Sequence, residues 1–438
     1  MKKRVAFHVL GCKVNQYEVE AFKELFREKN YKIVDFEDEA DVYLIHTCTV
    51  THLGDRKSRQ FIRKAVRKNP QAIVAVTGCY AQVSPQEVEQ IEGVDIVIGT
   101  KDRKRIVELI EGYDKGKPLK LVSEIKDNRS FEELPVVQPS RARAFLKIQE
   151  GCDRFCTYCI VPYARGPVKS RGFSNTIDEV NKLIEAGYKE IVLTGVHIGT
   201  YGKDLGYQET LFTLIEKLVE VPNLKRLRIS SLDPDDISPE LLELITENPI
   251  ICSHYHIPLQ SGDDHILQRM GRRYTTLEYQ QLIDSIRAKR PNAAITTDVI
   301  TGFPGETDEH FGNTANFIKN IAFADLHVFK YSPRRGTPAA GYTGQVPEKI
   351  KADRSNYLMA MTQELWQEYA SRFLGTTGQV LIEIASDGLW EGHTDNYLKV
   401  RFPLTAGDLS GTLVPVHLEK LSREKFIMGE LEGGDRNG

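Results

Sequence analysis

Six cysteines fall into two sets of three, and the first set constrains the fold more than any other feature of the chain. Cys12, Cys48 and Cys79 each follow a short apolar stretch and precede a segment with a helical pattern. The apolar stretches cover residues 5–10, 41–46 and 72–76. Strands that alternate with helices at this spacing favour a parallel sheet, whose strand ends meet along one edge. We therefore expect these three cysteines to lie together at that edge.

Each of these cysteines, taken alone, is most simply interpreted as a small buried hydrophobic residue. Three cysteines in the same structural position make a shared site the better interpretation. A fourth apolar strand, residues 94–98, completes the predicted sheet of a domain that covers residues 1–112. Residues 113–143 carry many charges and contain Pro118, Pro135 and Pro139, which predicts a linker.

The alternation of strands and helices starts again at residue 144 with different lengths. The expected strands cover residues 145–149, 190–194, 225–230, 254–258, 295–301 and 326–331. These units predict an open barrel of parallel strands over residues 144–372, with function at the carboxyl ends of the strands. A helix is expected near its end, over residues 350–374.

Short strands separated by Gly, Asp and Asn dominate the C-terminal part of the chain. They cover residues 380–384, 390–393, 397–402, 413–418 and 426–431. This spacing predicts a small antiparallel barrel over residues 373–434, of a kind that often binds single-stranded nucleic acid. The expected fold class is therefore α/β, with a parallel N-terminal α/β domain, a central partial (β/α)6 barrel and a small antiparallel C-terminal β-barrel.

The second set of cysteines forms a tight C-x3-C-x2-C run directly after the first strand of the predicted central barrel. A zinc site would usually bring further cysteines or histidines nearby. A redox pair of Cys156 and Cys159 would leave Cys152 unexplained. Three thiolates can hold three corners of a cubane iron–sulfur cluster and leave the fourth iron open. The seventh cysteine, Cys252, belongs to neither set and is interpreted as a buried structural thiol.

The C-x3-C-x2-C run resembles the radical SAM superfamily. That resemblance implies a [4Fe-4S] cluster on Cys152, Cys156 and Cys159, whose open iron binds S-adenosylmethionine (SAM) and generates a 5'-deoxyadenosyl radical. It also implies cofactor contacts from Tyr158, Gly195, Val196, His197, Ser230, Gln260, Ile300 and Gly302. The sequence departs from the superfamily after the second strand, where the usual Gly-Gly-Glu is missing. A lone histidine in an apolar setting, such as His197, is more often structural.

Nearly the whole chain resembles the radical SAM methylthiotransferase family. Matching motifs occupy residues 11–16, 46–50, 78–82, 256–262, 269–274 and 331–337. His46 departs from the asparagine usual in the family. The resemblance implies a second, auxiliary [4Fe-4S] cluster on Cys12, Cys48 and Cys79, and a TRAM-like RNA-binding domain in the C-terminal barrel.

Lys13 and Val14 resemble the family branch that acts on N6-threonylcarbamoyladenosine in tRNA. That branch inserts a methylthio group at C2 of the base at position 37, with one SAM as methyl donor and a second SAM as radical source. The implied partners are the tRNA anticodon loop and an electron donor of the flavodoxin or ferredoxin type. The alternatives are methylthiolation of N6-isopentenyladenosine or of a ribosomal protein, and a non-enzymatic iron–sulfur regulator that binds RNA.

Two groups of arginines are candidates for contact with RNA. At helical spacing, one face after Cys48 carries Arg56, Arg59, Arg63 and Arg67, although an ordinary solvated helix is the alternative. A second group lies near predicted strand ends or in loops and is suited to bind phosphate or the threonyl carboxylate. It consists of Arg272, Arg273, Arg334 and Arg335.

The formal net charge of -3 excludes broad electrostatic coating of nucleic acid, so local patches must hold any RNA. No apolar run approaches the roughly eighteen residues that span a membrane. The apolar stretch after Lys2, Lys3 and Arg4 is too short for an export signal. We expect a cytoplasmic enzyme.

Overall fold

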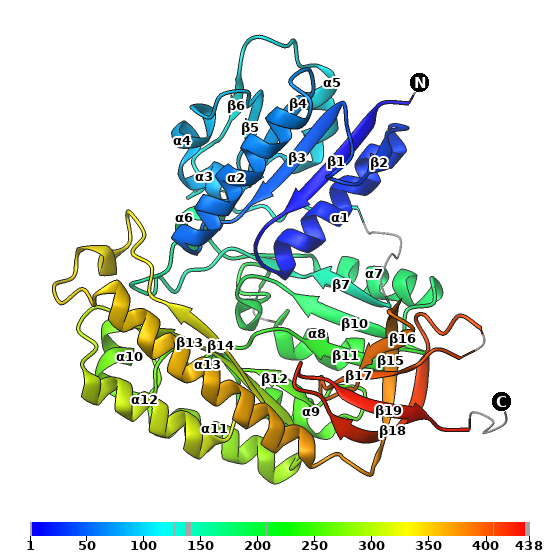
Figure 1. The fold of residues 1–438 in the computed structure, drawn as a ribbon, viewed down its shortest axis with the longest axis vertical. Coiled ribbons are helices and arrows are strands. Elements are labelled where there is room, and N and C mark those ends of the chain that lie inside the picture. Colours follow the sequence, from blue (N-terminus) through cyan, green and yellow to red (C-terminus); the bar gives the residue numbers. More distant parts are fainter. Residues whose placement is uncertain (1, 127, 136–141, 207, 406, 434–438) are drawn as a thin grey trace.

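The N-terminal part of the computed structural model is a six-stranded parallel sheet with the order β2-β1-β3-β4-β5-β6 (Figure 1). The structure describes residues 2–126, 128–135, 142–206, 208–405 and 407–433. The strands are β1 (Arg4–Val9), β2 (Lys32–Val34), β3 (Val42–Thr47), β4 (Ile73–Gly78), β5 (Ile96–Ile98) and β6 (Leu119–Leu121). All neighbouring pairs are parallel, which confirms the predicted sheet.

Alternating side chains of these buried strands face two separate cores. Val42 and Leu44 of β3 lie in one core, while Tyr43 and Ile45 lie in the other. In parallel sheets of this kind, helices usually bury both faces. The covering helices are α1 (Lys13–Glu28), α2 (His52–Lys68), α3 (Cys79–Val83), α4 (Pro85–Glu89) and α5 (Ile106–Glu111), with the 3-10 turn η1 (Arg103–Arg105). Thr51 caps α2 by accepting a hydrogen bond from the backbone N–H of Gly54.

Part of the segment predicted as a linker belongs to this sheet. Residues Leu119–Leu121 pair with β5 as the edge strand β6, and Leu134 is buried in the core beneath. A strand here satisfies the backbone groups that β5 would otherwise expose at a sheet edge. Residues 127 and 136–141 of the predicted linker lie outside the described residues.

The central part confirms the partial barrel, with six parallel strands in two halves ordered β11-β10-β7 and β12-β13-β14. The strands are β7 (Arg143–Lys147), β10 (Glu190–Thr194), β11 (Arg226–Ile229), β12 (His254–His256), β13 (Ala294–Thr301) and β14 (Asp325–Lys330). A parallel bridge between Leu227 and Ile251 joins the halves. A short antiparallel pair, β8 (Gln149–Glu150) with β9 (Lys169–Ser170), follows β7.

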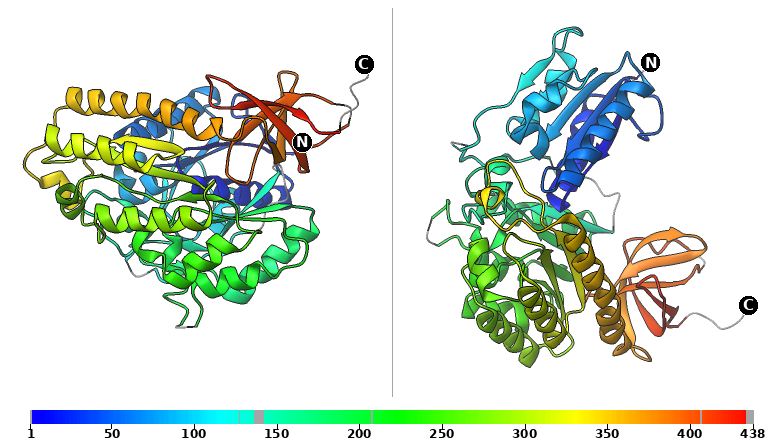
Figure 2. Two further views of the ribbon diagram at one scale, coloured as in Figure 1. Left: turned by 90° about the horizontal axis from the view of Figure 1, so that it is seen from below. Right: turned by 60° about the vertical axis from the view of Figure 1, so that its left-hand side comes forward.

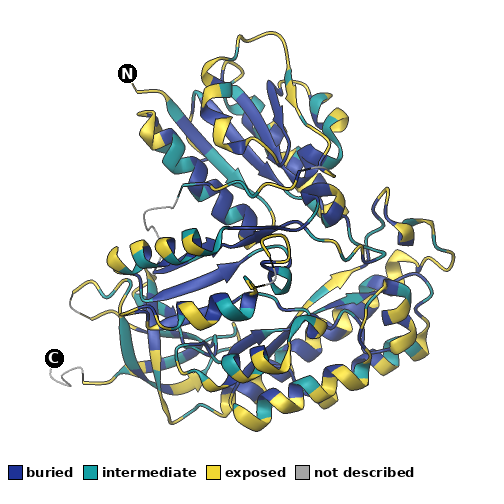
Figure 3. Cartoon of the chain, turned by 180° about the vertical axis from the view of Figure 1, so that it is seen from behind, coloured by how far each residue is buried: buried dark blue, intermediate teal, exposed yellow. Residues whose placement is uncertain are grey.

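Helices cover the outside of this barrel and turn an exposed face to solvent, while the strands are buried (Figure 3). They are α7 (Phe173–Glu185), α8 (Leu211–Leu218), α9 (Pro239–Glu247), α10 (Asp264–Met270), α11 (Thr276–Lys289) and α12 (Asp308–Ile321), while the short helix α6 (Val161–Arg165) lies against α3 of the N-terminal part. Three 3-10 turns lie in the loops: η2 (Ile198–Thr200), η3 (Pro234–Asp236) and η4 (Pro338–Gly341). Thr275 and Glu278 form a capping box that starts α11.

The C-terminal part begins with the long helix α13 (Glu348–Ser371), which leads into a closed five-stranded barrel (Figure 2). The barrel strands are β15 (Thr377–Ser386), β16 (Leu389–His393), β17 (Lys399–Pro403), β18 (Leu413–Leu421) and β19 (Ile427–Leu431). The predicted barrel is confirmed, with antiparallel pairing except between β17 and β19, which are parallel. Within the described residues, no helix combines the length and apolar character needed to cross a membrane.

Tyr397 fixes this small barrel against the amino ends of the central strands. Its ring stacks on His254, at the start of β12, with ring centroids 4.7 Å apart. The guanidinium groups of Arg143 and Arg228 lie over the same ring at 5.2 and 4.8 Å. The small barrel therefore closes the end of the central barrel opposite to the carboxyl strand ends.

Candidate functional site

The three dispersed cysteines lie at the carboxyl ends of adjacent strands. Cys12 follows β1 as the N-cap of α1, Cys48 follows β3, and Cys79 begins α3 directly after β4. A Cβ added at Gly11, the residue before Cys12, would lie 3.2 Å from the Cys48 sulfur. Burial raises the pKa of Cys48 to about 12, and the neighbouring Cys79 and Cys12 thiols add to the shift. The structure thus brings the three thiols together at the sheet edge where the carboxyl ends of the strands align.

A buried charge network surrounds the Cys79 side of this triad. The Arg165 Nε–H donates to the Cys79 sulfur over 3.3 Å, and the same guanidinium group binds Glu18 and Glu150. Arg103 and Lys147 also bind these two carboxylates. All five side chains are at most 2% exposed. A positive charge is therefore fixed beside one sulfur of the dispersed triad.

The tight triad lies on a loop that starts at Gly151, after β8, and folds back on itself. The Cys159 backbone N–H donates to the Cys156 carbonyl, and the Cys152 N–H donates to the Gly166 carbonyl. Burial raises the pKa of Cys159 to about 12, with further contributions from the Cys156 and Cys152 thiols. The three thiols are therefore close enough to interact electrostatically, as one shared site requires.

Gly151 is required at the start of this loop because its φ is +78° and a Cβ there would lie 1.8 Å from the Pro167 carbonyl oxygen. We expect Gly151→Ala to displace the loop and to lower the iron bound by the tight triad. The matched control is Gly187→Ala, where φ is +99° and no atom lies within 4 Å of the added carbon. Iron analysis of both variants after anaerobic reconstitution checks this, and equal iron in both would contradict it.

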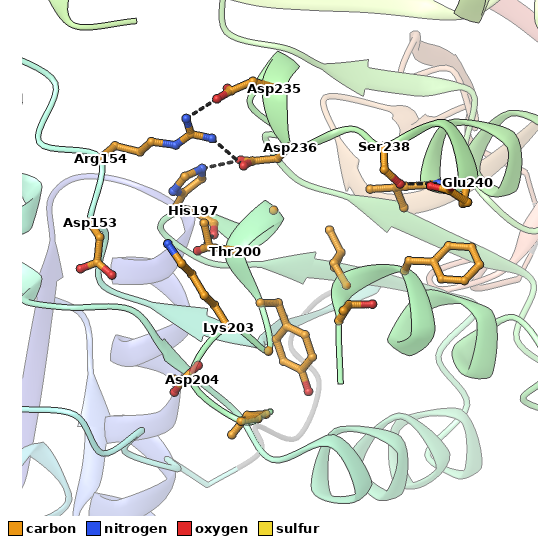
Figure 4. A pocket seen from close by; sticks show the side chains of 18 of the residues that line it. Asp153, Arg154, His197, Thr200, Lys203, Asp204, Asp235, Asp236, Ser238 and Glu240 are labelled. Atoms are coloured by element: carbon orange, nitrogen blue, oxygen red, sulfur yellow. Dashed lines mark hydrogen bonds and ion pairs between the residues drawn. The ribbon is translucent and has the colours of Figure 1, made fainter. Parts of the chain in front are cut away.

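Nitrogen groups accompany two sulfurs of the tight triad. His197 Nδ1 lies 3.5 Å from the Cys152 sulfur, and its Nε2 is hydrogen-bonded to Asp236. Arg272 Nη1 lies 3.6 Å from the Cys156 sulfur, and its Nη2 donates to Asp233 over 2.6 Å. The expected apolar setting of His197 is therefore wrong, because the histidine lies between a sulfur and a carboxylate in a polar pocket (Figure 4).

Both triads fit iron–sulfur clusters by the chemistry of their donors. Each gathers three thiols with no disulfide between them. Burial raises the pKa of Cys79 and Cys156. Without a cation such thiols stay protonated, and bound iron would supply the charge that stabilises the thiolates. Arg165 and Arg272 would then face negatively charged sulfur.

The loop after β10 holds three of the expected cofactor residues. The Gln149 side-chain oxygen accepts hydrogen bonds from the backbone N–H groups of Val196 and His197. A Cβ on Gly195 would lie 2.8 Å from the Gln149 carbonyl oxygen, so this position needs glycine. On the neighbouring loop, the Ser230 hydroxyl is buried and has no partner within the described residues. An unpaired hydroxyl at a strand end is suited to a polar ligand.

The other expected cofactor residues line the second half of the barrel. Tyr158 and Ile300 pack on one small apolar cluster that contains Phe303. Gln260 has a φ of +66°, and its backbone N–H and carbonyl pair with β13 on either side of Val299. Gly302 has a φ of +72°, and its N–H donates to Glu306. Glu306 is itself bound by Arg354, so it holds the loop.

The arginines after Cys48 lie on α2 as expected. Arg56, Arg63 and Arg67 are exposed. Arg59 is partly buried because it donates to the Tyr80 hydroxyl over 3.0 Å. Arg59 and Arg63 also line a shallow pocket with Tyr80. Three of the four guanidinium groups are therefore free to face a large anionic partner.

The second group of arginines divides into two buried and two exposed side chains. Arg272 is bound to Asp233, and Arg334 is bound to Asp55 and Thr49 beside Cys48. These two do not present free guanidinium groups to an RNA phosphate or a carboxylate, and the expectation for them is corrected. Long charged side chains are buried only when they are paired. Arg273 and Arg335 are exposed.

Sequence reasoning missed several residues of the site. Gln149 positions the loop after β10, Arg165 reaches Cys79, and Arg154 binds Asp235 and Asp236 beside His197 (Figure 4). Gln149 and Arg165 lie outside the cysteine run, and Arg154 lies inside it at a position that holds no ligand. Their partners lie tens of residues away in the sequence, so no local pattern reveals them.

Comparisons with known proteins agree with this architecture. Residues 4–99 match the family described as Uncharacterized protein family UPF0004, and residues 146–318 match the Radical SAM superfamily. The solved structure of the radical S-adenosylmethionine methyltransferase TsrM from Kitasatospora setae, with cobalamin and a [4Fe-4S] cluster bound, has a TM-score of 0.56. It is 15% identical and covers 76% of this chain and 77% of its own, which indicates a shared fold.

Two relatives cover most of the chain. The threonylcarbamoyladenosine tRNA methylthiotransferase MtaB of Bacillus subtilis (strain 168) is 47% identical over 423 residues, 95% of this chain and 94% of that protein. The tRNA-2-methylthio-N(6)-dimethylallyladenosine synthase of Clostridium novyi (strain NT) is 38% identical over 394 residues, 87% of this chain and 86% of that protein. The chain belongs to the radical SAM methylthiotransferase family.

Proposed function

We propose that this protein inserts a methylthio group at C2 of N6-threonylcarbamoyladenosine at position 37 of tRNA. The observation that carries the proposal is the presence of two cysteine triads on one chain that is 47% identical, over 95% of its length, to a threonylcarbamoyladenosine tRNA methylthiotransferase. Cys152, Cys156 and Cys159 hold one [4Fe-4S] cluster. A second cluster is held by Cys12, Cys48 and Cys79.

The segment between the triads supports a shared reaction site. Only Ile160 separates Cys159 from α6, and Arg165 at the end of this short helix donates to the Cys79 sulfur. The Thr100 hydroxyl also donates to the Ala164 carbonyl over 2.8 Å. One short helix therefore contacts both cysteine sites, which keeps their relative position fixed.

When bound, the clusters and SAM supply the radical, the methyl group and the sulfur for such a reaction. The protein's own residues bind and orient. Gln149 fixes the loop after β10, and the unpaired Ser230 hydroxyl is available to SAM. Arg272 places an N–H group beside the Cys156 sulfur, which stabilises negative charge there, and His197 places a ring nitrogen beside the Cys152 sulfur. The electron needed for the reaction comes from a reduced flavodoxin or ferredoxin.

The test is mass spectrometry of nucleosides from tRNA carrying N6-threonylcarbamoyladenosine, incubated with reconstituted enzyme, SAM and a reductant. We expect a product heavier by one methylthio group in exchange for hydrogen. A parallel reaction uses tRNA with N6-isopentenyladenosine, the base class of the second relative. Product only from the isopentenyl substrate would overturn the proposal.

The exposed face of α2 is proposed to hold the tRNA, and substitution tests this directly. We expect a triple variant, Arg56→Ala with Arg63→Ala and Arg67→Ala, to weaken tRNA binding and to lower the slope of log Kd against log salt by about 2, since each phosphate contact contributes about 0.7–0.9. The control replaces the exposed Lys182, Lys217 and Lys289 on the outer helices. An unchanged slope in the arginine variant would contradict the assignment.

A further inference from the structure

Three polar side chains from neighbouring strands meet on the inner face of the central barrel. Asp298 of β13 accepts from His327 of β14 over 3.0 Å and lies 3.2 Å from His256 of β12. The second nitrogen of His256 is hydrogen-bonded to Thr296 at 3.0 Å. None of these three side chains has a role in the proposed binding of the iron–sulfur clusters or of SAM.

The cluster is open to solvent rather than packed. The His327 side chain is 58% exposed and that of Asp298 is 28% exposed, although both stand in the middle of strands. The second Asp298 oxygen and the second His327 nitrogen make no contact among the described residues. An exposed polar cluster inside a barrel is a place for a ligand.

Strand alternation places the cluster below the cysteine loop. Asp298 and Ile300 are two residues apart on β13, so they share a face and lie about 7 Å apart. Ile300 packs on the same apolar cluster as Tyr158, which stands between Cys156 and Cys159. At the opposite end, Tyr397 and His254 close the barrel. The cluster therefore lies between the tight triad and the floor of the barrel.

Lys13 approaches the same place from the N-terminal sheet. It follows Cys12 directly, its residue is exposed, and no hydrogen bond or ion pair of its ammonium group is found in the described part of the chain. Its ammonium group is close enough to interact electrostatically with Tyr397, Arg228 and Arg143 at the floor of the barrel, and with Asp298 and His327. Because Lys13 adjoins Cys12, a positive charge beside the dispersed triad lies within electrostatic reach of this cluster.

We propose that His256, Asp298, His327 and Lys13 form the subsite for the threonylcarbamoyl group of the substrate base. This inference rests on the proposed function. The carboxylate of that group binds Lys13 and His327, and its hydroxyl and amide N–H groups donate to the free Asp298 oxygen. An isopentenyl group offers no such partners, so it would leave these polar groups unpaired, which is how a polar pocket rejects an apolar analogue.

Other anion-binding groups near the site do not compete for this role. Arg272 and Arg334 are bound to aspartates, while Arg143 and Arg228 are bound to Glu383 and Glu190. His256, Asp298 and His327 each offer one possible ligand atom to a divalent cation, and these atoms lie within 4.8 Å of one another, so the test below also measures bound metal. The Lys13 ammonium group, the second His327 nitrogen and the second Asp298 oxygen match an organic anion that also carries a hydroxyl group.

The test compares two forms of one tRNA, with native N6-threonylcarbamoyladenosine or with its carboxylate converted to the methylamide by carbodiimide coupling. We expect wild-type enzyme to lose about tenfold or more in kcat/KM and in tRNA affinity on the amide, because a charge-assisted contact is removed. His327→Gln should lose a similar factor on native tRNA and little more on the amide. The control, His265→Gln on α10, should behave as wild type.

Several results would overturn the subsite. Equal use of both tRNAs by wild type, or full discrimination retained in His327→Gln, would contradict it while leaving the proposed function intact. Stoichiometric divalent metal in wild type that is lost in His327→Gln would assign the cluster to a cation instead. By contrast, an enzyme that modifies only isopentenyladenosine would defeat the proposed function itself.

Discussion

Cys156→Ala is expected to abolish the reductive cleavage of SAM, while Cys252→Ala leaves it intact. Cys156 is buried within the tight loop beside Arg272, and a cubane cluster held by three thiolates cannot keep its open iron with one of them missing. Cys252 is also buried, but it lies between β11 and β12, away from both triads. 5'-Deoxyadenosine formed by reduced protein, measured by chromatography, checks the first expectation.

Iron content provides the second measurement on the same pair of variants. Cys156→Ala should lose about half of the bound iron and Cys252→Ala should lose none, because only one of the two clusters is affected. Equal loss of 5'-deoxyadenosine formation in both variants would contradict the ligand assignment. So would full activity in Cys156→Ala.

Glu18→Gln is expected to destabilise the protein by about 3–5 kcal/mol, the cost of leaving buried charges without their partner. The Glu18 side chain is 0% exposed and binds Arg103, Lys147 and Arg165, and its Oε2 atom also bonds His46. The glutamine has the same shape but removes the negative charge. For a domain of about 150–250 residues this loss of stability corresponds to a fall in Tm of about 10 °C. Thermal unfolding of the reconstituted protein measures it.

The control for Glu18→Gln is Glu20→Gln on the same helix. Glu20 makes a single surface ion pair with Lys23, and such pairs are worth about 1 kcal/mol or less. Arg103, Arg165 and Lys147 lower the pKa of Glu18 well below its ordinary 4.5, against the opposing effect of burial. Its stabilisation is thus present above pH 4.5 and declines as pH falls. Equal Tm changes in both variants would contradict the account.

Local patterns were sufficient to predict the framework. The strands that carry the cysteines are apolar runs bounded by turns, and the spacing of Cys152, Cys156 and Cys159 is a short-range signal. The edge strands β2 and β6 were missed because each is a three-residue segment that contains a lysine, whereas β5 is an uninterrupted apolar run. Such a short run has too little periodicity to stand out, and its pairing depends on the neighbouring strand.

Burial and long-range pairing were not accessible from the sequence. Arg165 and Glu18 are 147 residues apart, and no sequence motif joins them. Arg334 pairs with Asp55, which is 279 residues away in the sequence. The burial of Arg334 could therefore not be predicted. His327 and Asp298 become neighbours only through the register of β13 and β14. These contacts are properties of the packed chain.

The most direct test of two clusters on one chain is iron and labile sulfide analysis after anaerobic reconstitution. We expect about eight irons and eight sulfides per wild-type chain. Replacing either Cys12, Cys48 and Cys79 or Cys152, Cys156 and Cys159 by alanine should leave about four of each. A wild-type chain with about four irons, or either triple variant with the full content, would contradict the account.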